Sequence, residues 1–451
     1  SLSARDALTG EDLGVEKTRQ FVKVKINNAL RAAIDNALGS LTLRAADTET
    51  RLAAAAKLFR SRDASALPAL EAALEDETDG AVKAAMAQAR AAILFLSAEA
   101  SLAQRLEATA VLRARGDQSA LGLLSRLAPD APEELTAATE EAKASIERAI
   151  EAWGYAQTVW YGISLGSVLM LAAIGLAITF GVMGVINMAH GELVMIGAYT
   201  TFVVQEIIRN NAPELFDLSL LIAAPLAFLV AGAVGIGIER GVVRYLYGRP
   251  LETLLATWGV SLILQQAVRT IFGPNNREVG NPSWMSGSFD IGLMSITYSR
   301  LWILIFALAV FALLLLVLKR TSLGLQMRAV TQNRAMARDM GVRTDWIDAL
   351  TFALGAGVAG LAGVALSQID NVSPNLGQSY IIDSFMVVVF GGVGNLWGAL
   401  AGAFTLGIAN KFLEPFAGAV LAKILVLVII ILFIQKRPRG LFALRGRAVD
   451  N

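Results

Sequence analysis

Three polar side chains interrupt an otherwise apolar part of this chain, and their types could support proton transfer, metal binding or recognition of a polar solute. Asn187, His190 and Glu192 supply an amide, an imidazole and a carboxylate within about two helical turns. Such groups between apolar segments are expected to face a polar pathway, a subunit contact or the membrane boundary. In a purely structural role, Asn187 caps a helix and Glu192 stabilises its positive end. A catalytic His190–Glu192 pair is disfavoured, because no nucleophile or metal-ligand set accompanies it.

The composition narrows the chemistry further. The chain has no cysteine and one histidine, which excludes a disulfide framework and a zinc-thiolate or multi-histidine site. No GxxxxGK[ST] phosphate-binding loop is present. A net charge of +1 without basic aromatic clusters gives no indication of nucleic acid binding. We therefore expect a chain that is not an enzyme and that carries no cofactor or metal of its own.

A glycine-rich stretch around Asn395 predicts a helix that breaks and then restarts. Discontinuous helices inside membranes need buried or hydrated surroundings for their freed backbone groups, and they commonly lie beside a substrate route. Asn395 is therefore a fourth candidate for the pathway, together with Asn187, His190 and Glu192. The glycines at residues 355–363 predict close helix packing instead.

A short basic stretch, residues 324–342, lies between two apolar segments and predicts one amphipathic helix. Leu325, Ala329, Met336 and Met340 fall near one face at helical spacing, and the stretch ends in a glycine suited to a left-handed C-cap. Because an isolated helix this short is marginal in water, we expect it to dock on a cytoplasmic partner. The alternative is a helix lying on anionic lipid. The positions assigned to the partner contact are Gly324, Arg328, Asn333, Arg334, Ala337, Arg338 and Gly341.

Apolar segments dominate residues 156–440, and they are too long and too numerous for a soluble core. We expect about nine membrane spans, some discontinuous, near 158–184, 188–208, 218–238, 252–272, 300–318, 347–369, 381–396, 398–413 and 418–435. Basic residues follow the third, fifth and last of these, which places those loops and a tail at 441–451 in the cytoplasm. The N-terminal part then lies in the periplasm, whereas an even number of spans would place it in the cytoplasm.

Residues 1–155 show helical periodicity without an apolar run long enough to cross a bilayer, so we expect a soluble α-helical domain. Two similar stretches begin at Arg51 and Arg105 and predict stacked HEAT-like helical repeats. Such a domain binds another protein or acts as a spacer. The start at Ser1 suits removal of a signal peptide as well as an arbitrary boundary. The expected fold class is all-α throughout.

Four separated motifs resemble the permeases of the branched-chain amino acid class of ABC importers. They occupy residues 186–193, 261–274, 324–342 and 389–399 in the expected order. The long helical extension before residue 158, together with the tail at 436–442, resembles the urea permease subunit of that class.

This resemblance implies a pathway-forming permease subunit for urea in the bacterial inner membrane. It further implies a heterodimer with a second permease subunit, two cytoplasmic ATPase subunits that bind ATP and Mg, a periplasmic urea-binding protein, and surrounding membrane lipid. The alternative substrates are branched-chain amino acids or short amides. A secondary transporter or channel, or a membrane-anchored interaction protein, are the remaining function classes.

Overall fold

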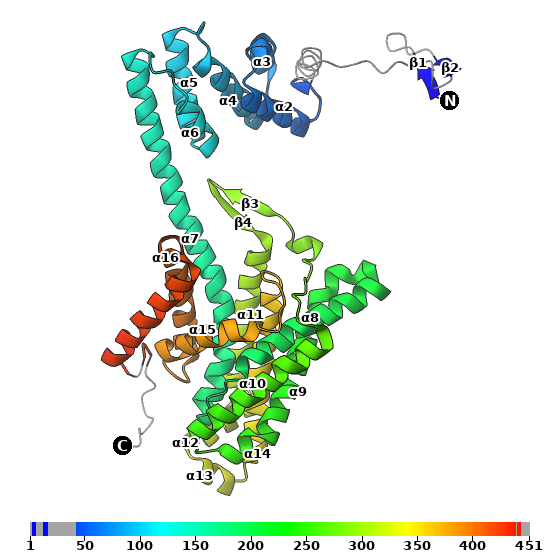
Figure 1. Ribbon diagram of the computed structural model, residues 1–451, viewed down its shortest axis with the longest axis vertical. Coiled ribbons are helices and arrows are strands. Elements are labelled where there is room, and N and C mark those ends of the chain that lie inside the picture. Colours follow the sequence, from blue (N-terminus) through cyan, green and yellow to red (C-terminus); the bar gives the residue numbers. More distant parts are fainter. Residues whose placement is uncertain (1, 6–11, 17–41, 439, 443–451) are drawn as a thin grey trace. The chain divides into compact units, whose positions relative to one another are not determined.

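The structure is a computed structural model that describes residues 2–5, 12–16, 42–438 and 440–442. The expected tail at 441–451 therefore lies almost entirely outside the described residues. The chain divides into two compact units, Ser1–Ala152 and Trp153–Asn451. The described part is nearly all-α, and its strands form two antiparallel hairpins (Figure 1). These are β1 (Leu2–Arg5) with β2 (Asp12–Glu16), and β3 (Ser288–Ile291) with β4 (Met294–Thr297).

The first unit is built from capped amphipathic helices. They are α2 (Thr48–Ser61), η2 (Ala64–Ala66), α3 (Leu67–Asp76), α4 (Gly80–Leu96), α5 (Leu102–Arg115), α6 (Gln118–Leu124) and the start of α7 (Glu133–Met183). Asp47, Asp79, Ser101 and Asp117 accept hydrogen bonds from backbone N–H groups in the first turns of α2, α4, α5 and α6. Leu, Ala and Phe side chains from these helices form one buried core.

The two similar stretches, which begin at Arg51 and Arg105, end in turns of the same kind. Arg62 after α2 and Gly116 after α5 both have positive φ, 55° and 69°, and each is followed by an aspartate that caps the next helix. Arg62 is the single non-glycine residue with positive φ in the described part of the chain. The local geometry of the two stretches is therefore alike, while the HEAT class stays a prediction.

The second unit contains the long apolar helices. They are α7, α8 (His190–Asn211), η3 (Pro213–Leu218), α9 (Ser219–Gly241), η4 (Val243–Leu246), α10 (Pro250–Phe272), η5 (Ser283–Met285), α11 (Tyr298–Arg320), α12 (Ser322–Gln332), α13 (Arg334–Asp339), α14 (Thr344–Leu366), α15 (Leu376–Gly391) and α16 (Leu396–Lys436). Figure 1 shows α12 and α13 at one end of α9 and α14, and the β3–β4 hairpin at the opposite end of this unit.

Six helices among the described residues are long and apolar enough to cross a membrane. They are α7, α8, η3 with α9, α11, α14 and α16. The expected fourth span corresponds to α10, which is less apolar, and the expected seventh to α15, which has only 16 residues. The expected eighth and ninth spans correspond to the two parts of α16, which is broken at Gly418, where φ is 75°. The count of nine spans therefore stays a prediction.

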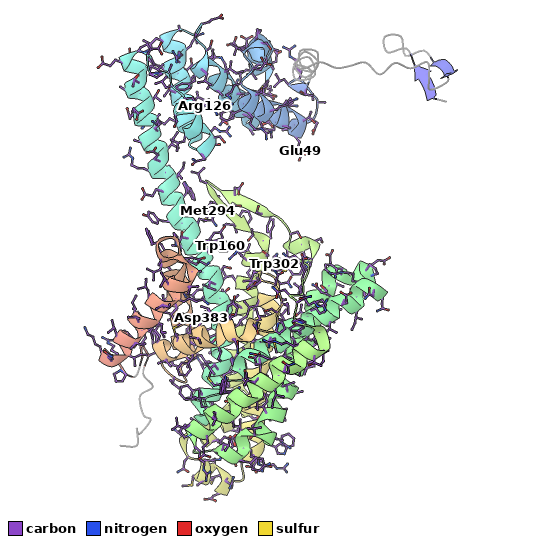
Figure 2. The ribbon with its side chains drawn as sticks, in the orientation of Figure 1. Glu49, Arg126, Trp160, Met294, Trp302 and Asp383 are labelled. Atoms are coloured by element: carbon purple, nitrogen blue, oxygen red, sulfur yellow. The ribbon has the colours of Figure 1, made fainter. Side chains whose placement is uncertain are left out.

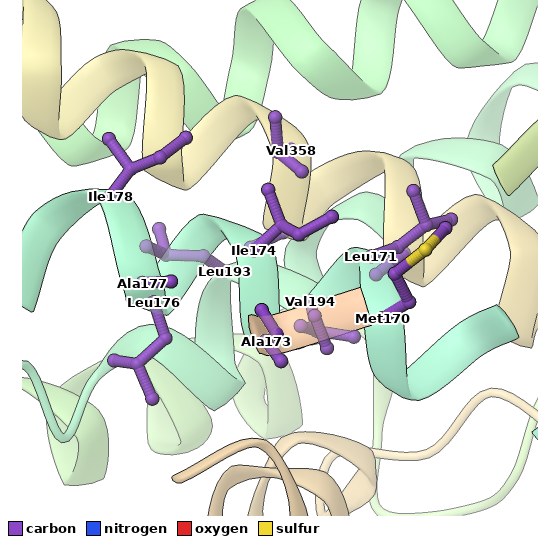
Figure 3. Close-up of a cluster of buried hydrophobic side chains, with 14 of the residues drawn as sticks. Met170, Leu171, Ala173, Ile174, Leu176, Ala177, Ile178, Leu193, Val194 and Val358 are labelled. Atoms are coloured by element: carbon purple, nitrogen blue, oxygen red, sulfur yellow. The ribbon is translucent and has the colours of Figure 1, made fainter. Parts of the chain in front are cut away.

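Close backbone contacts hold the central helices together. A Cβ atom on Gly363 of α14 would lie 2.0 Å from the carbonyl oxygen of Val194 in α8, and one on Gly197 of α8 would lie 2.1 Å from that of Gly360 in α14. Only glycine allows two helices to approach this closely. Figure 3 shows the apolar core beside these contacts, where Ile174 of α7, Leu193 of α8 and Val358 of α14 belong to one buried cluster.

The expected single helix at 324–340 is wrong, because α12 and α13 are separate helices. Asn333 between them has an extended backbone, and its side-chain oxygen accepts a hydrogen bond from the backbone N–H of Met336 at 3.0 Å. Asparagine competes for backbone hydrogen bonds in this way, so it ends α12 and caps α13. Gly341 has a φ of 88°, which is the left-handed conformation that the sequence predicted.

Candidate functional site

The break between α7 and α8 brings the polar residues of the 187–192 segment into the interior. Asn187, His190 and Glu192 are each 1% exposed. The Asn187 side-chain oxygen accepts a hydrogen bond from the backbone N–H of Ala189 at 3.0 Å, which fixes the turn before α8. His190 Nε2 donates to the carbonyl oxygen of Ala172 in α7 at 2.8 Å, which requires the Nε2–H tautomer when the ring is neutral.

Glu192 in the first turn of α8 is held by α10. Its Oε1 accepts hydrogen bonds from Ser261 Oγ at 2.9 Å and from Gln265 Nε2 at 2.7 Å. Its Oε2 atom has no partner, and neither does Asn187 Nδ2. The Nδ1 atom of His190 is also without a partner. The cluster therefore keeps an acceptor on Glu192, a donor on Asn187 and one ring nitrogen of His190 that the described residues do not satisfy.

A stripe of polar residues along α10 forms the other side of this cluster. Thr253, Thr257, Ser261 and Gln265 recur every four residues and are all buried. Thr257 Oγ1 accepts from the backbone N–H of Met188 at 3.1 Å, so the stripe also supports the break between α7 and α8. The opposite face of α10 exposes apolar side chains. The four-residue spacing of these polar residues is a sequence signal that could have identified the stripe.

Asn395 lies at a different place and has a different role from the Asn187–Glu192 segment. It is the N-cap of α16, where its side-chain oxygen accepts from the backbone N–H groups of Trp397 and Gly398 at 3.0 and 3.2 Å. Its Nδ2 atom donates to the carbonyl oxygen of Phe442 at 3.3 Å. These contacts give it a structural function at the break between α15 and α16, and the structure does not bring it together with the other three candidates.

The positions assigned to a docking helix divide into buried, internally bonded and exposed ones. Gly324 and Ala337 are buried, and Arg328 donates to the carbonyl oxygen of Leu318. Three apolar side chains of this stretch are exposed, Leu325, Met336 and Met340, the last by 78%, and polar residues such as Gln332 and Asp339 are exposed beside them. The sequence placed Leu325, Ala329, Met336 and Met340 near one face, and the structure leaves all of these except the half-buried Ala329 exposed.

The arginines of α13 form contacts with other residues of the second unit. Arg334 forms an ion pair with Asp348 of α14 and lies over the ring of Tyr247, 4.7 Å from its centroid. Arg338 contacts Asp345 at 3.5 Å and donates to Thr344 Oγ1 at 3.1 Å. We had expected these arginines to contact a partner, and sequence reasoning missed the acidic residues at the start of α14 that hold them.

Two acidic neighbours surround Tyr247. Burial, reinforced by the carboxylates of Asp348 and Glu239, raises the pKa of Tyr247. Its hydroxyl group therefore stays protonated and donates to Glu239 Oε1 at 3.0 Å. This network connects α13 with the cytoplasm-side ends expected for α9 and α14.

A second ion pair lies between α15 and α16. Lys423 Nζ contacts Asp383 Oδ2 at 2.9 Å, and Asp383 is buried (Figure 2). Charged groups in apolar helices are expected to be paired in this way. Neither residue was a candidate in the sequence, because each is a single charge inside an apolar run.

The comparison with known families accounts for most of this unit. Residues 158–434 match the family described as the branched-chain amino acid transport system permease component. The chain belongs to this family. The matched region covers α8 to α15 completely, together with most of the apolar part of α7 and nearly all of α16. It therefore includes the buried polar cluster and α12–α13.

Individual relatives agree with the family assignment. The chain is 32% identical over 298 residues to the high-affinity branched-chain amino acid transport system permease protein BraD of Pseudomonas aeruginosa, covering 64% of this chain and 96% of the relative. It is 32% identical over 296 residues to the corresponding protein LivH of Escherichia coli, covering 64% and 95%. The ribose import permease protein RbsC of Haemophilus influenzae is 23% identical over 264 residues, covering 55% and 74%. No solved structure matches.

These relatives are permease subunits of ABC importers and not enzymes, and this chain is a permease of the same branched-chain amino acid type. The expectation of urea as substrate finds no support among them, and the amino acid alternative fits better. The N-terminal 157 residues lie outside the family match.

Proposed function

We propose that this chain is a translocation subunit for branched-chain amino acids, driven by separate ATPase subunits. The observation that carries the proposal is the family match over residues 158–434, together with relatives matched over about 95% of their length. The break between α7 and α8 lies inside the matched region, as does the buried polar stripe of α10.

Two of the three unsatisfied groups of the buried cluster, those on Glu192 and Asn187, suit a zwitterion. The free Oε2 of Glu192 is an acceptor for an ammonium group, and the free Nδ2 of Asn187 is a donor for a carboxylate. The side chains are packed in the interior here, so the cluster must open towards the pathway during transport. His190, bonded to Ala172, holds α8 against α7 beside this opening.

The apolar face of α12–α13 is the proposed contact with an ATPase subunit. Leu325, Met336 and Met340 would enter a groove on that partner, and the ion pairs of Arg334 and Arg338 would pass its movement to α14. ATP and Mg bind to the partner. The full importer further contains a second permease subunit and a periplasmic solute-binding protein.

The proposed topology places α12–α13 in the cytoplasm of the bacterial cell and the first unit in the periplasm. The absence of cysteine makes this directly testable. An impermeant thiol reagent should label Ser61→Cys in intact spheroplasts and leave Ala335→Cys unlabelled until the cells are lysed. The reverse pattern would exclude this orientation and the odd number of spans.

Urea is the second candidate substrate, and one observation favours it. The first unit is absent from the matched region, and it resembles the extension of urea permeases. A neutral solute would use the same donor on Asn187 and acceptor on Glu192.

Uptake measurements separate the two substrates. A strain that lacks this chain should take up labelled leucine slowly and recover when the chain is restored, with unchanged urea uptake. Recovery of urea uptake alone would overturn the amino acid assignment. Recovery of either solute without the ATPase subunits would overturn the ABC mechanism and favour a secondary transporter.

A further inference from the structure

An apolar cavity lies at the end of the second unit opposite α12 and α13. Its volume is about 460 Å³, and its walls come from the start of α9, the start of α11, the end of α14 and η5. Nearly all of its lining is hydrophobic or aromatic, including Leu220, Trp302, Phe306 and Ala365. A cavity of this size and lining is typical of a binding site for a small or elongated apolar molecule.

The cavity is distinct from the buried cluster of Asn187 and Glu192. Its position is held by the loop before α11, where Trp284 of η5 donates from Nε1 to the carbonyl oxygen of Asp217 at 2.8 Å. Trp284 also packs edge to face against Trp302 of α11, which is labelled in Figure 2, with 5.2 Å between ring centroids. Paired tryptophans of this kind are characteristic of the level at which a membrane protein leaves the hydrocarbon region.

One polar side chain lines this apolar space with an unpaired acceptor atom. Gln368, just after α14, lines the cavity and is 6% exposed. Its Nε2 atom donates to Ser367 Oγ at 3.1 Å, whereas its Oε1 atom is buried and unpaired. An unpaired buried acceptor is costly unless a donor reaches it.

The α9 wall adds a second acceptor. Pro225 has no N–H group, so the carbonyl oxygen of Leu221 does not receive the hydrogen bond that residue 225 would otherwise supply. Both residues line the cavity. The occupant therefore needs an apolar body and at least one O–H or N–H donor near its polar end.

The mouth of the cavity continues onto an exposed apolar surface of α9 and α11. Leu221 of α9 and Ile305 of α11 belong to the lining and are also exposed, by 66% and 46%. Both helices are apolar enough to span the membrane. A bilayer lipid can thus enter sideways, without crossing the polar boundary.

We propose that this cavity binds one acyl chain of a membrane phospholipid, with a donor in its headgroup bonded to Gln368. Phosphatidylethanolamine carries N–H donors and phosphatidylglycerol carries O–H donors, whereas the choline group of phosphatidylcholine carries none. Lipids of the first two kinds therefore satisfy the acceptor, and the third fills only the apolar space. The bound chain supports the contact of α9, α11 and α14, and this inference does not depend on the transported solute.

The test uses the full chain purified in detergent, with thermal unfolding measured after addition of each phospholipid at equal acyl composition. Phosphatidylethanolamine and phosphatidylglycerol should raise the unfolding temperature by at least about 2 °C more than phosphatidylcholine. In Gln368→Leu this headgroup preference should disappear while the shift common to all three lipids remains. In Ala365→Phe, which fills the cavity, the common shift should fall as well.

Matched substitutions on the exposed side of α10 serve as controls. Gln266→Leu and Ala267→Phe make the same chemical changes outside the cavity and should leave both the preference and the common shift intact. If Ala365→Phe does not fold, retention of phospholipid in native mass spectra of wild type and Gln368→Leu provides a second readout. Equal shifts in all variants would overturn the proposal, as would stabilisation by free leucine that Ala365→Phe abolishes.

Discussion

Arg334 in α13 forms an ion pair with Asp348 in α14, and the two side chains differ in their surroundings. Arg334 is 38% exposed at its side chain, whereas Asp348 is 2% exposed. The buried carboxylate therefore depends on a cation that arrives from the surface helix. This relationship joins the proposed docking element to a membrane helix through one contact.

Removal of the cation should destabilise the unit. In Arg334→Met, the buried Asp348 loses its cationic partner, and we expect a loss of up to roughly 3 kcal/mol in unfolding free energy. Exchanging the residues, Arg334→Asp with Asp348→Arg, should recover part of that loss and part of the transport. Thermal unfolding and leucine uptake measure both, with Arg343→Met at an exposed arginine as control. If Arg334→Met has the unfolding temperature and the leucine uptake of wild type, the ion pair contributes to neither stability nor transport.

A second prediction concerns the exposed face of α13. Met336→Asp or Met340→Asp should abolish copurification of the ATPase subunits while the amount of folded permease stays near wild type, because both side chains are exposed. Met327→Asp serves as contrast, since Met327 is buried and its substitution should prevent folding. Intact association in both surface variants would move the docking site away from α13.

The third prediction separates recognition from packing at Glu192. In Glu192→Gln, the remaining carbonyl oxygen still accepts from Ser261 and Gln265, so stability should change little. Loss of the charged acceptor at the other oxygen should lower leucine uptake at saturating binding protein by about tenfold or more. Gln265→Met should lower stability by about 1–3 kcal/mol instead. Normal uptake by a well-folded Glu192→Gln protein would contradict a pathway role.

Backbone conformation supplies a fourth prediction, in the first unit. Arg62 has a φ of 55°, which costs a residue with a Cβ atom about 1 kcal/mol relative to glycine. Arg62→Gly should therefore raise the unfolding temperature of a fragment comprising residues 42–152 by a few degrees. Gly116→Ala, at the equivalent turn, should lower it by a similar amount. Circular dichroism measures both, and a destabilised Arg62→Gly fragment would show that the arginine side chain is needed.

A fifth prediction concerns acid sensitivity of the same fragment. The backbone N–H of Asp79, followed by Arg51, lowers the pKa of Glu77. A lowered pKa in the folded state means that Glu77 stabilises the fragment above its unfolded value near 4.5, and that this contribution is lost as pH falls through the folded value. Glu77→Gln should thus make the free energy of unfolding less dependent on pH between about pH 5 and 3. Glu99→Gln, at an exposed position, is the control. If the unfolding free energy of Glu77→Gln depends on pH in the same way as that of wild type, Glu77 does not contribute to the acid sensitivity.

The sequence was a good guide where a residue acts locally. Gly341 and the break before His190 follow from backbone preferences of single residues. The sequence did not predict the contacts between residues that are distant in the chain. Asp348 holds Arg334, and Gln265 holds Glu192, across separations that no local pattern encodes. The sequence predicted Asn395 as part of the pathway, because an asparagine that caps a helix and one that lines a pathway cannot be told apart by residue type.

The glycine contacts between α8 and α14 have a mechanical consequence. Gly363 against Val194, and Gly197 against Gly360, leave no room for one helix to slide or roll over the other. These helices can move only as one rigid link. The backbone of this unit departs from helix at several other places, among them residues 184–189, Asn333 and Gly418. Crosslinks that bridge such breaks should therefore stop a transport cycle, whereas crosslinks between α8 and α14 should not.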